Sequence, residues 1–480
     1  MEKIKSFIKS LNLRWSDLFM LLGFLPFTLF LIFGQLFMQY PNPNEVAFKL
    51  WAIILCFVIS ASSWGIYIYL ERKNGNKPHN IVTWIFVILA IIGVIGIIIQ
   101  PNLFQETIVV RFVNDINKEV YGDNIQIGDI VNAPLAPMNI STTHYVFFTM
   151  DILLILLFIY IGLFIFPKRF TNILFIKYFG YAVIILVAVM MFYSYIFEYY
   201  KFIPFIKALL GQGGNVYDYT LVSFIIHRNA YGMTALIGIV FCFINHTIER
   251  KWWYWLIAIF FFVNMIFSFC KTSILISALL IVVYAVYRLV FTYKEFPKRN
   301  RNILICGGCV AFLAILVVGI SLVSEGKFLS PIYNLIKGDN GAGSLDNRTY
   351  IWDNCYQLLR ENPIYYFFGR GFGLTNVMLL PMNTANGDKV FPTHSAFLNL
   401  LTEGGFFYLF AYLLFMGYSI YVIIKTYKKS PALTVAISLG VLAFTIYSII
   451  ETIHYLVYGF MFPVMILYHV SYLESQEVKQ

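Results

Sequence analysis

The sequence predicts an all-α, polytopic membrane protein, in which a bundle of about twelve transmembrane helices crosses the bilayer. Of its 480 residues, 60% are hydrophobic and only 12% are charged, whereas about a quarter of the residues of a soluble protein are charged. The apolar residues are gathered in runs of about 20, which is long enough to cross the hydrocarbon core as helices. We therefore expect a single integral membrane domain over residues 1–480.

The apolar runs follow one another along the whole chain. The first run comes after a basic segment and has full spanning length, and no small-residue cleavage site follows it, so it predicts an anchor rather than a signal peptide. The approximate limits of the runs are residues 18–37, 50–70, 81–99, 145–166, 179–199, 231–245, 253–269, 272–291, 303–321, 395–424, 432–450 and 455–472.

The basic residues predict the orientation of these spans. Most of the 34 lysine and arginine residues fall in the short segments of one side, and short loops rich in lysine and arginine normally face the cytoplasm. Both termini are then cytoplasmic, and two long excursions lie outside: a first outer loop at residues 100–144 and a large outer loop at residues 324–393. The net charge of +10 is split among short turns, so nucleic acid is not an expected partner.

Two shorter helices are expected between the spans on the outer side. Residues 201–210 are apolar but too few to cross a membrane, which predicts an interfacial helix. Residues 345–359 of the large outer loop have apolar side chains at helical spacing, at Ile351, Trp352, Tyr356 and Leu359.

Cationic side chains gather on the predicted outer face, beside glycine-rich turns. Arg228 precedes the sixth span, Lys271 lies in a tight turn before the eighth, and Arg348 lies in the large outer loop with Arg370 further along it. Arginine offers phosphate a planar fork of donors, and lysine offers a point charge. Each residue alone is explained by snorkelling or by an ordinary ion pair. Their concentration on the face that normally lacks positive loops predicts a shared anion site.

His394, at the start of the tenth span, is the candidate general base, because histidine titrates near neutral pH. Its simpler interpretation is an interfacial histidine satisfied by backbone or water. Asp151 is the clearest acid within a span; such acids are functional candidates, although one near the boundary can also hydrogen-bond a neighbouring helix. Glu403 is a candidate supporting residue. No carboxylate cluster with metal spacing occurs, so neither a metal nor another cofactor is expected.

Between Arg228 and Tyr472 the chain carries several distinctive segments, namely His394-Ser-Ala-Phe-Leu-Asn-Leu-Leu-Thr-Glu-Gly-Gly405, Arg348-x-x-x-Trp352, Asn362-Pro363, Gly369-x-Gly371 and Arg228-Asn229. Together these segments resemble the bacterial O-antigen ligase and polymerase superfamily. The twelve-span layout, with the main loop between the ninth and tenth spans, is similar as well. One departure is Lys271, since the family often has arginine in that turn.

The resemblance implies a metal-independent glycosyltransferase of surface polysaccharide biosynthesis, for O-antigen or capsule in the cell envelope. Its donor is a glycan on polyprenyl (undecaprenyl) diphosphate, with His394 as catalytic base and Arg228, Lys271 and Arg348 binding the diphosphate. The implied location is the bacterial cytoplasmic (inner) membrane, with the active site on its outer face. Apart from the lipid bilayer and the lipid-linked oligosaccharide, the implied partners are a flippase and a chain-length regulator.

Three functions remain open at this point. A polymerase of lipid-linked repeat units is favoured, because two sizeable outer loops can hold a donor and an acceptor chain. A ligase that moves finished glycan to another acceptor has the same leaving group and the same motifs. A flippase or other transporter of lipid-linked oligosaccharide is less favoured. Transporters place their sites near the bilayer midplane and often show repeated halves, whereas here the cations gather at one face and the halves differ.

Overall fold

A computed structural model describes most of the chain. The chain divides into two compact units, of which the first comprises residues 1–171, 345–418 and 454–471, and the second residues 172–344, 419–453 and 472–480. Each unit is considered by itself. The described residues are 14–39, 43–76, 80–101, 107–113, 124–126, 129–135, 140, 142–169, 173–210, 212, 214, 216–225, 228–291, 302, 346–375, 378–379, 393–451, 467, 469–470 and 473.

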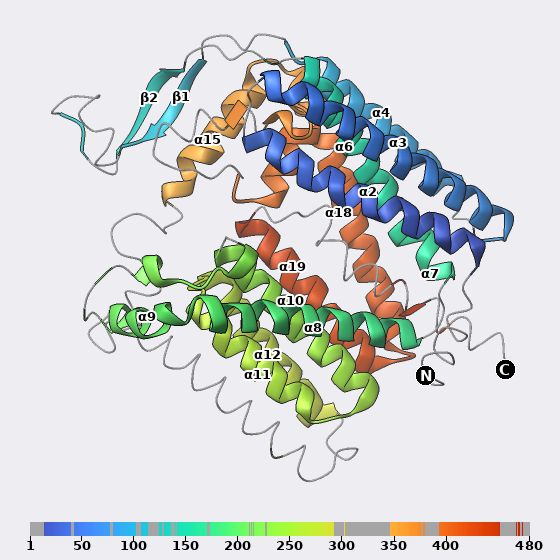
Figure 1. Cartoon of the computed structure of the whole chain (residues 1–480), viewed down its shortest axis with the longest axis vertical. Coiled ribbons are helices and arrows are strands. Elements are labelled where there is room, and N and C mark those ends of the chain that lie inside the picture. The colour runs from blue at the N-terminus through green and yellow to red at the C-terminus, as the bar shows by residue number, and fades with distance from the viewer. Residues whose placement is uncertain are drawn as a thin grey trace. The chain divides into compact units, whose positions relative to one another are not determined.

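Long apolar helices make up most of the first unit (Figure 1). The span that begins with α6 continues through a π-helical turn, Ile161–Ile165, into α7 (Phe166–Arg169). Pro167 lies just past this turn; proline cannot donate a backbone hydrogen bond, and a locally widened helix accommodates that loss. The long helices are α2 (Trp15–Gln39), α3 (Pro43–Lys73), α4 (Asn80–Ile98), α6 (Thr142–Tyr160) and α18 (Ala396–Tyr427), of which residues up to 418 belong to this unit.

Small residues let these helices approach one another closely, as is usual in membranes. Helices α2 and α3 lie side by side (Figure 1), with Gly23 against the Trp64 ring. Ser60 Oγ donates to the Gly23 carbonyl at 2.9 Å. On α4, Gly93 leaves room for Tyr408, whose hydroxyl donates to the Leu89 carbonyl at 2.5 Å. Polar side chains thus fasten neighbouring helices without breaking them.

The two segments predicted as outer loops contribute elements that pack together in this unit. Strands β1 (Thr107–Phe112) and β2 (Ile130–Leu135) form an antiparallel pair, and β1 packs against α15 (Asp346–Arg360). Helix α15 confirms the helix predicted for residues 345–359, and the short α16 (Ile364–Phe368) follows it. Tyr356, one of the four side chains whose spacing predicts this helix, is 40% exposed.

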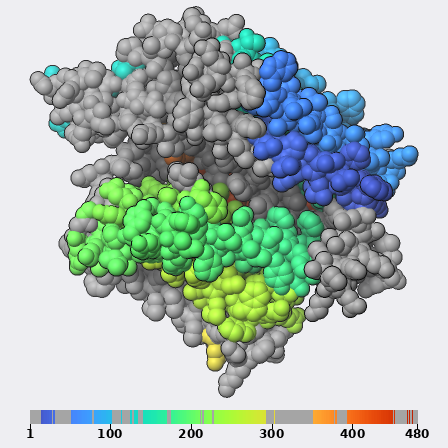
Figure 2. Space-filling view, viewed as in Figure 1, coloured from blue at the N-terminus to red at the C-terminus, as the bar shows by residue number. Residues whose placement is uncertain are grey.

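The second unit is built around α10, which is buried along most of its length and packs against α8, α11, α12 and α19. Gly238 of α10 allows close packing of Phe261 and Val187. The side chains of α8 and α9, green in Figure 2, form part of the visible face of this unit, beside the yellow-green side chains of later helices. Its helices are α8 (Ile173–Phe197), α9 (Phe202–Leu209), α10 (Arg228–Glu249), α11 (Trp253–Phe267), α12 (Lys271–Phe291) and α19 (Pro431–Ile450).

The architecture confirms the predicted all-α polytopic fold. Within the described residues, eight helices are long and apolar enough to cross a membrane. The short helix expected at residues 201–210 is present as α9. The β1–β2 pair was not predicted. The ninth predicted run, residues 303–321, lies outside the described residues, as does most of the twelfth, residues 455–472.

Candidate active site

Two candidate cations of the second unit stand at the N-termini of neighbouring helices. Arg228 is the first residue of α10, and Lys271 is the first residue of α12. The first turns of these helices touch, because a Cβ on Gly232 would lie 2.7 Å from Cys270 Cβ and 3.0 Å from Ser273 Oγ. Helix N-termini carry partial positive charge and exposed N–H donors. Their pairing beside two cationic side chains favours a bound anion.

Two aromatic rings in contact with each other connect Arg228 to Lys271. The Arg228 guanidinium lies over the Tyr217 ring, 4.3 Å from its centroid. The Tyr217 ring meets Phe269 edge-on at 5.1 Å, and Lys271 Nζ lies 5.6 Å from the Phe269 centroid. Arg228 Nη1 is buried and makes no hydrogen bond within the part of the chain that the structure describes. A buried guanidinium donor of this kind suits a phosphate oxygen.

Helix α19 is fastened to the same place. Ser273 Oγ donates to the Tyr447 hydroxyl at 3.2 Å, and that hydroxyl donates to the Asn229 carbonyl at 3.3 Å. The Asn229 side chain donates to Glu451 at 3.2 Å. We call this region the Arg228 end of the second unit: the first turns of α10 and α12 with the last residues of α8, α11 and α19. These hydrogen bonds join the first turns of α10 and α12, which carry the cations, to α19.

In the first unit, His394 occupies a strained turn directly before α18. Its φ of 49° lies in the left-handed region, which costs about 1–2 kcal/mol for a residue with a Cβ. Trp352 Nε1 donates to the Thr393 carbonyl at 2.7 Å, and Thr393 Oγ1 donates to the Ser395 carbonyl at 2.7 Å. The backbone at the half-buried His394 is thus held by contacts on either side of it. Strain held in this way is typical of functional positions.

Arg348 belongs to the helix that supports this turn. It lies in α15, one helical turn before Trp352, whose indole holds the Thr393 carbonyl. The Arg348 side chain lies outside the described residues. Among the described residues, the Arg348-x-x-x-Trp352 motif thus contacts the backbone beside His394 through Trp352.

The glycine motifs form a close backbone contact. Helix α18 is kinked at Gly405, whose φ is 69°, and the kink leaves carbonyls of the preceding turn free of their helical partners. The Arg370 N–H donates to the Thr402 carbonyl at 2.7 Å, and the Gly371 N–H donates to the Glu403 carbonyl at 3.0 Å. A side chain at Gly369 would collide with the Glu403 carbonyl. The glycines therefore join the large outer loop to α18.

The remaining candidates, Arg370, Glu403 and Asp151, lie around this contact. Arg370 is fully buried, pairs with Glu361 at 2.6 Å and stacks on Tyr365 at 4.1 Å. Burial lowers the pKa of its guanidinium, and the Glu361 charge opposes that shift. Glu403 accepts a hydrogen bond from the Gly373 N–H at 3.3 Å and lies close enough to Asp151 for electrostatic interaction. Arg370 and Glu403 thus hold the loop rather than face open solvent.

The structure therefore gathers the predicted residues in two groups. Arg228 and Lys271 meet in the second unit, whereas His394, Arg348, Arg370, Glu403 and Asp151 belong to the first. Sequence reasoning missed Tyr217, the ring that joins the two cations, and nothing in its local pattern marked it. Among the described residues, no group of three or more His, Cys, Asp and Glu side chains is arranged to hold a metal ion.

These features define a multi-pass helical membrane protein with cationic side chains at the helix ends and a histidine in a strained turn. Residues 219–413 match the family model described as O-antigen ligase. The match confirms the resemblance to the O-antigen ligase and polymerase superfamily, and it includes Arg228, Lys271, Arg348 and His394. No curated protein and no solved structure matches the chain. The family indicates ligase-type or polymerase-type processing of glycans at a membrane.

Proposed function

We propose that the protein is a membrane glycosyltransferase that polymerises polyprenyl-diphosphate-linked oligosaccharide repeat units into a surface polysaccharide. The observation that carries the proposal is the pair of cations at the Arg228 end, within the segment that matches the O-antigen ligase family. A diphosphate leaving group concentrates negative charge, and fixed cations and helix N-termini stabilise it as the glycosidic bond breaks.

The reaction we propose is a single displacement. A hydroxyl oxygen of the acceptor sugar forms a bond to the anomeric carbon of the donor, and the bond from that carbon to the diphosphate oxygen breaks. His394 takes the hydroxyl proton as general base. Arg228, Lys271 and Arg348 stabilise the negative charge that develops on the diphosphate, so the step runs without a metal ion. The products are the lengthened lipid-linked glycan and free polyprenyl diphosphate.

Deletion of the gene tests the polymerase directly. Cells without the protein should display single repeat units and no long glycan ladder, as measured by gel electrophoresis of surface glycans. Restoration of the ladder by the wild-type gene, but not by a His394→Ala variant of equal abundance, would complete the test.

Cysteines placed in residues 100–144 should react with an impermeant reagent from outside if the active face is the outer face of the bacterial inner membrane.

A ligase is the second candidate, favoured by the description of the matching family. It would transfer finished glycan to another acceptor through the same displacement at the anomeric carbon. The deletion separates the two functions: without a ligase, long polymer still forms but stays on polyprenyl diphosphate. Recovery of such polymer from the membrane fraction would refute the polymerase and leave the displacement chemistry in place.

A chain-length regulator and a flippase are the proteins we propose as partners of the polymerase.

A further inference from the structure

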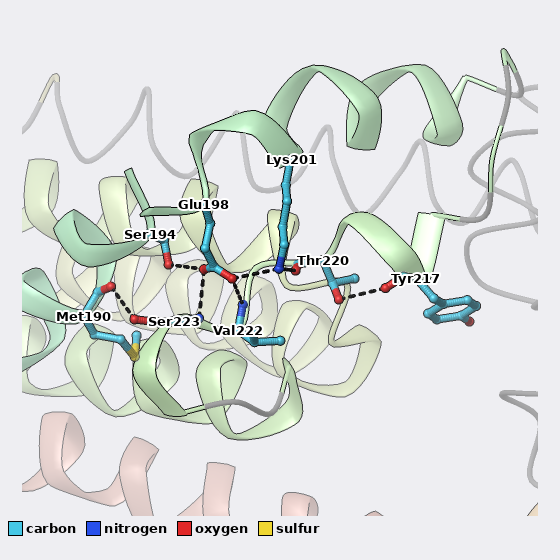
Figure 3. A network of polar contacts seen from close by, with 8 residues as sticks. All are labelled: Met190, Ser194, Glu198, Lys201, Tyr217, Thr220, Val222 and Ser223. Carbon is cyan, nitrogen blue, oxygen red and sulfur yellow. Dashed lines mark hydrogen bonds and ion pairs between the residues drawn. The ribbon is translucent and has the colours of Figure 1, made fainter. Parts of the chain in front are cut away.

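A buried carboxylate, Glu198, is connected to the proposed diphosphate site through a single loop. Glu198 follows α8 directly and is only 7% exposed. Its oxygens accept hydrogen bonds from Ser194 Oγ at 2.7 Å, from Lys201 Nζ at 2.8 Å and from the Ser223 N–H at 2.9 Å (Figure 3). The Val222 N–H approaches the same carboxylate at 3.4 Å. Glu198 thus fastens an irregular backbone segment to the end of a helix.

The fastened segment is residues 217–223, which we call the clamp segment. Lys201 Nζ donates to the Thr220 carbonyl at 3.2 Å, and Thr220 Oγ1 donates to the Tyr217 carbonyl at 3.0 Å (Figure 3). At its other end Ser223 has a φ of 55°, in the left-handed region, and its hydroxyl donates to the Met190 carbonyl at 2.8 Å. A non-glycine residue keeps this conformation only where its surroundings impose it, and Glu198 is one of the two groups that do so.

The clamp segment carries the ring on which Arg228 rests. Tyr217 is its first residue, and the ring of Tyr217 contacts both the Arg228 guanidinium and Phe269, the residue under Lys271 Nζ. Glu198 and Lys201 therefore reach the two cations through one loop and one aromatic ring. No described hydrogen bond or ion pair joins either residue to Arg228.

We infer that Glu198, together with Lys201, is a positioning residue for the donor diphosphate: the pair holds the clamp segment so that Tyr217 keeps Arg228 aimed at the anion. The inference rests on the proposed function, since it concerns the binding of that donor. It assigns the pair no part in proton transfer and no contact with the substrate.

The charge of Glu198 suits this part. Burial by itself would raise the pKa of its carboxyl, but the hydrogen bonds from Lys201, Ser194 and Ser223 outweigh burial and lower that pKa below its usual value. The group is therefore an anion at neutral pH. As an anion it accepts hydrogen bonds on both oxygens, whereas an amide at the same position has one oxygen and two N–H donors that face existing donors.

The chain offers a matched control at the opposite end of the same two helices. Glu249, the last residue of α10, pairs with Lys177 of α8 at 2.5 Å and accepts hydrogen bonds from the hydroxyls of Tyr181 and Tyr254. Like Glu198 it is a shielded carboxylate with a lysine partner. Unlike Glu198 it is hydrogen-bonded by side chains of helices, with no clamp segment and no link to Arg228 among its described contacts.

The experiment measures binding of farnesyl diphosphate, a short isoprenyl diphosphate, to the full-length protein in detergent micelles by isothermal titration calorimetry. We expect Glu198→Gln to weaken binding about tenfold, which corresponds to the loss of a hydrogen bond with a charged group. Glu249→Gln should bind within about twofold of the wild type. In turnover assays Glu198→Gln should raise the donor KM about tenfold and change kcat by less than about twofold.

Further variants keep the result decisive. Lys201→Met should weaken binding as Glu198→Gln does, and Lys201→Arg should restore most of it, because a cation again reaches the carboxylate and the loop. If Glu198→Gln fails to fold, the Lys201 pair of variants carries the test. Arg228→Ala is the positive control, with the largest loss of farnesyl diphosphate binding.

The outcomes separate two failures. Loss of binding in Arg228→Ala, with wild-type binding in Glu198→Gln and Lys201→Met, would overturn the positioning role and leave the proposed donor site standing. Equal losses in Glu198→Gln and Glu249→Gln would also overturn it, because the effect would then be general destabilisation. Wild-type binding in Arg228→Ala would refute the donor site itself, and the positioning role with it.

Discussion

The two ends of α8 and α10 hold a shielded glutamate in different ways. At one end the described partners of Glu249 are all side chains: Lys177 and Tyr181 of α8, Tyr254 of α11, and Lys251 of the turn between α10 and α11. At the Arg228 end Glu198 meets backbone N–H groups of an irregular segment. The first arrangement fastens helix to helix. In the second arrangement a carboxylate stabilises a backbone conformation that the segment would not adopt unaided. Functional positions are often held in this way.

Left-handed residues show the same difference. Arg250 has a φ of 58° just after α10, the ordinary position for such a residue at a helix C-terminus. Ser223 and His394 instead lie before α10 and α18, and Phe269 lies in the short turn between α11 and α12. Each lies within five residues of a candidate substrate-binding or catalytic side chain, or is one itself. The comparison thus predicts that the irregular turns before these helices serve the reaction and that the Glu249 end serves stability alone.

The largest effect is expected from the left-handed turn at His394. His394→Gly removes the imidazole but keeps the backbone conformation, which glycine adopts readily. Turnover should fall at least about 100-fold, the usual contribution of a general base, while the melting temperature in detergent stays level or rises. The matched variant is Arg250→Gly, which should keep both activity and stability. Near-normal turnover of His394→Gly at neutral pH would remove the general-base role.

The next largest effect is expected from exchanging arginine and lysine at the proposed diphosphate-binding positions. Arg348→Lys replaces a planar fork with a point charge, whereas Lys271→Arg does the reverse. We expect Arg348→Lys to reduce kcat/KM for the donor about tenfold or more, as loss of a charge-assisted hydrogen bond does, and Lys271→Arg to change it less. The measurement is turnover with a lipid-linked donor. A larger loss in Lys271→Arg would show that the α12 N-terminus needs the compact ammonium group.

The sequence was enough for much of this arrangement. Apolar runs predicted the long helices, and apolar spacing predicted α15. Arg228 and Lys271 could be grouped because both stand at the start of spans on one predicted face. The β1–β2 pair carried a usable signal that was passed over, the β-branched run Thr-Ile-Val-Val at residues 107–110.

Other features left no local trace in the sequence. Glu198 looks like any acid that follows a span, and only its contact with residues 222 and 223 distinguishes it. The Trp352 indole finds the Thr393 carbonyl across a separation of 41 residues, which no periodicity encodes. Tyr217 became significant only through the rings and cations packed around it.

A smaller effect is expected inside α18, where a kinked and a regular glycine occur in one helix. Gly405→Ala places a Cβ at a φ of 69° and against the Phe367 carbonyl, so the protein should lose about 2 kcal/mol of stability or more. A Cβ at Gly417 meets nothing within 4 Å, and Gly417→Ala should gain up to about 1 kcal/mol. Thermal unfolding in detergent measures both. Equal stability of the two variants would show that the kink is adaptable and does not join the large outer loop to α18.

The smallest effect is expected from Lys251, at the Glu249 end. Its Nζ lies 3.4 Å from Glu249, but its side chain is 52% exposed, whereas that of Lys177 is 21% exposed and lies at 2.5 Å. Water screens the more exposed pair, so Lys251→Ala should change the free energy of unfolding by about 0.5 kcal/mol or less and leave donor KM and kcat unaltered. Thermal unfolding and a turnover assay check the two parts separately. A loss of activity here would mean that side-chain contacts at the Glu249 end also act on the substrate, and the distinction between the two ends of α8 and α10 would then be one of degree.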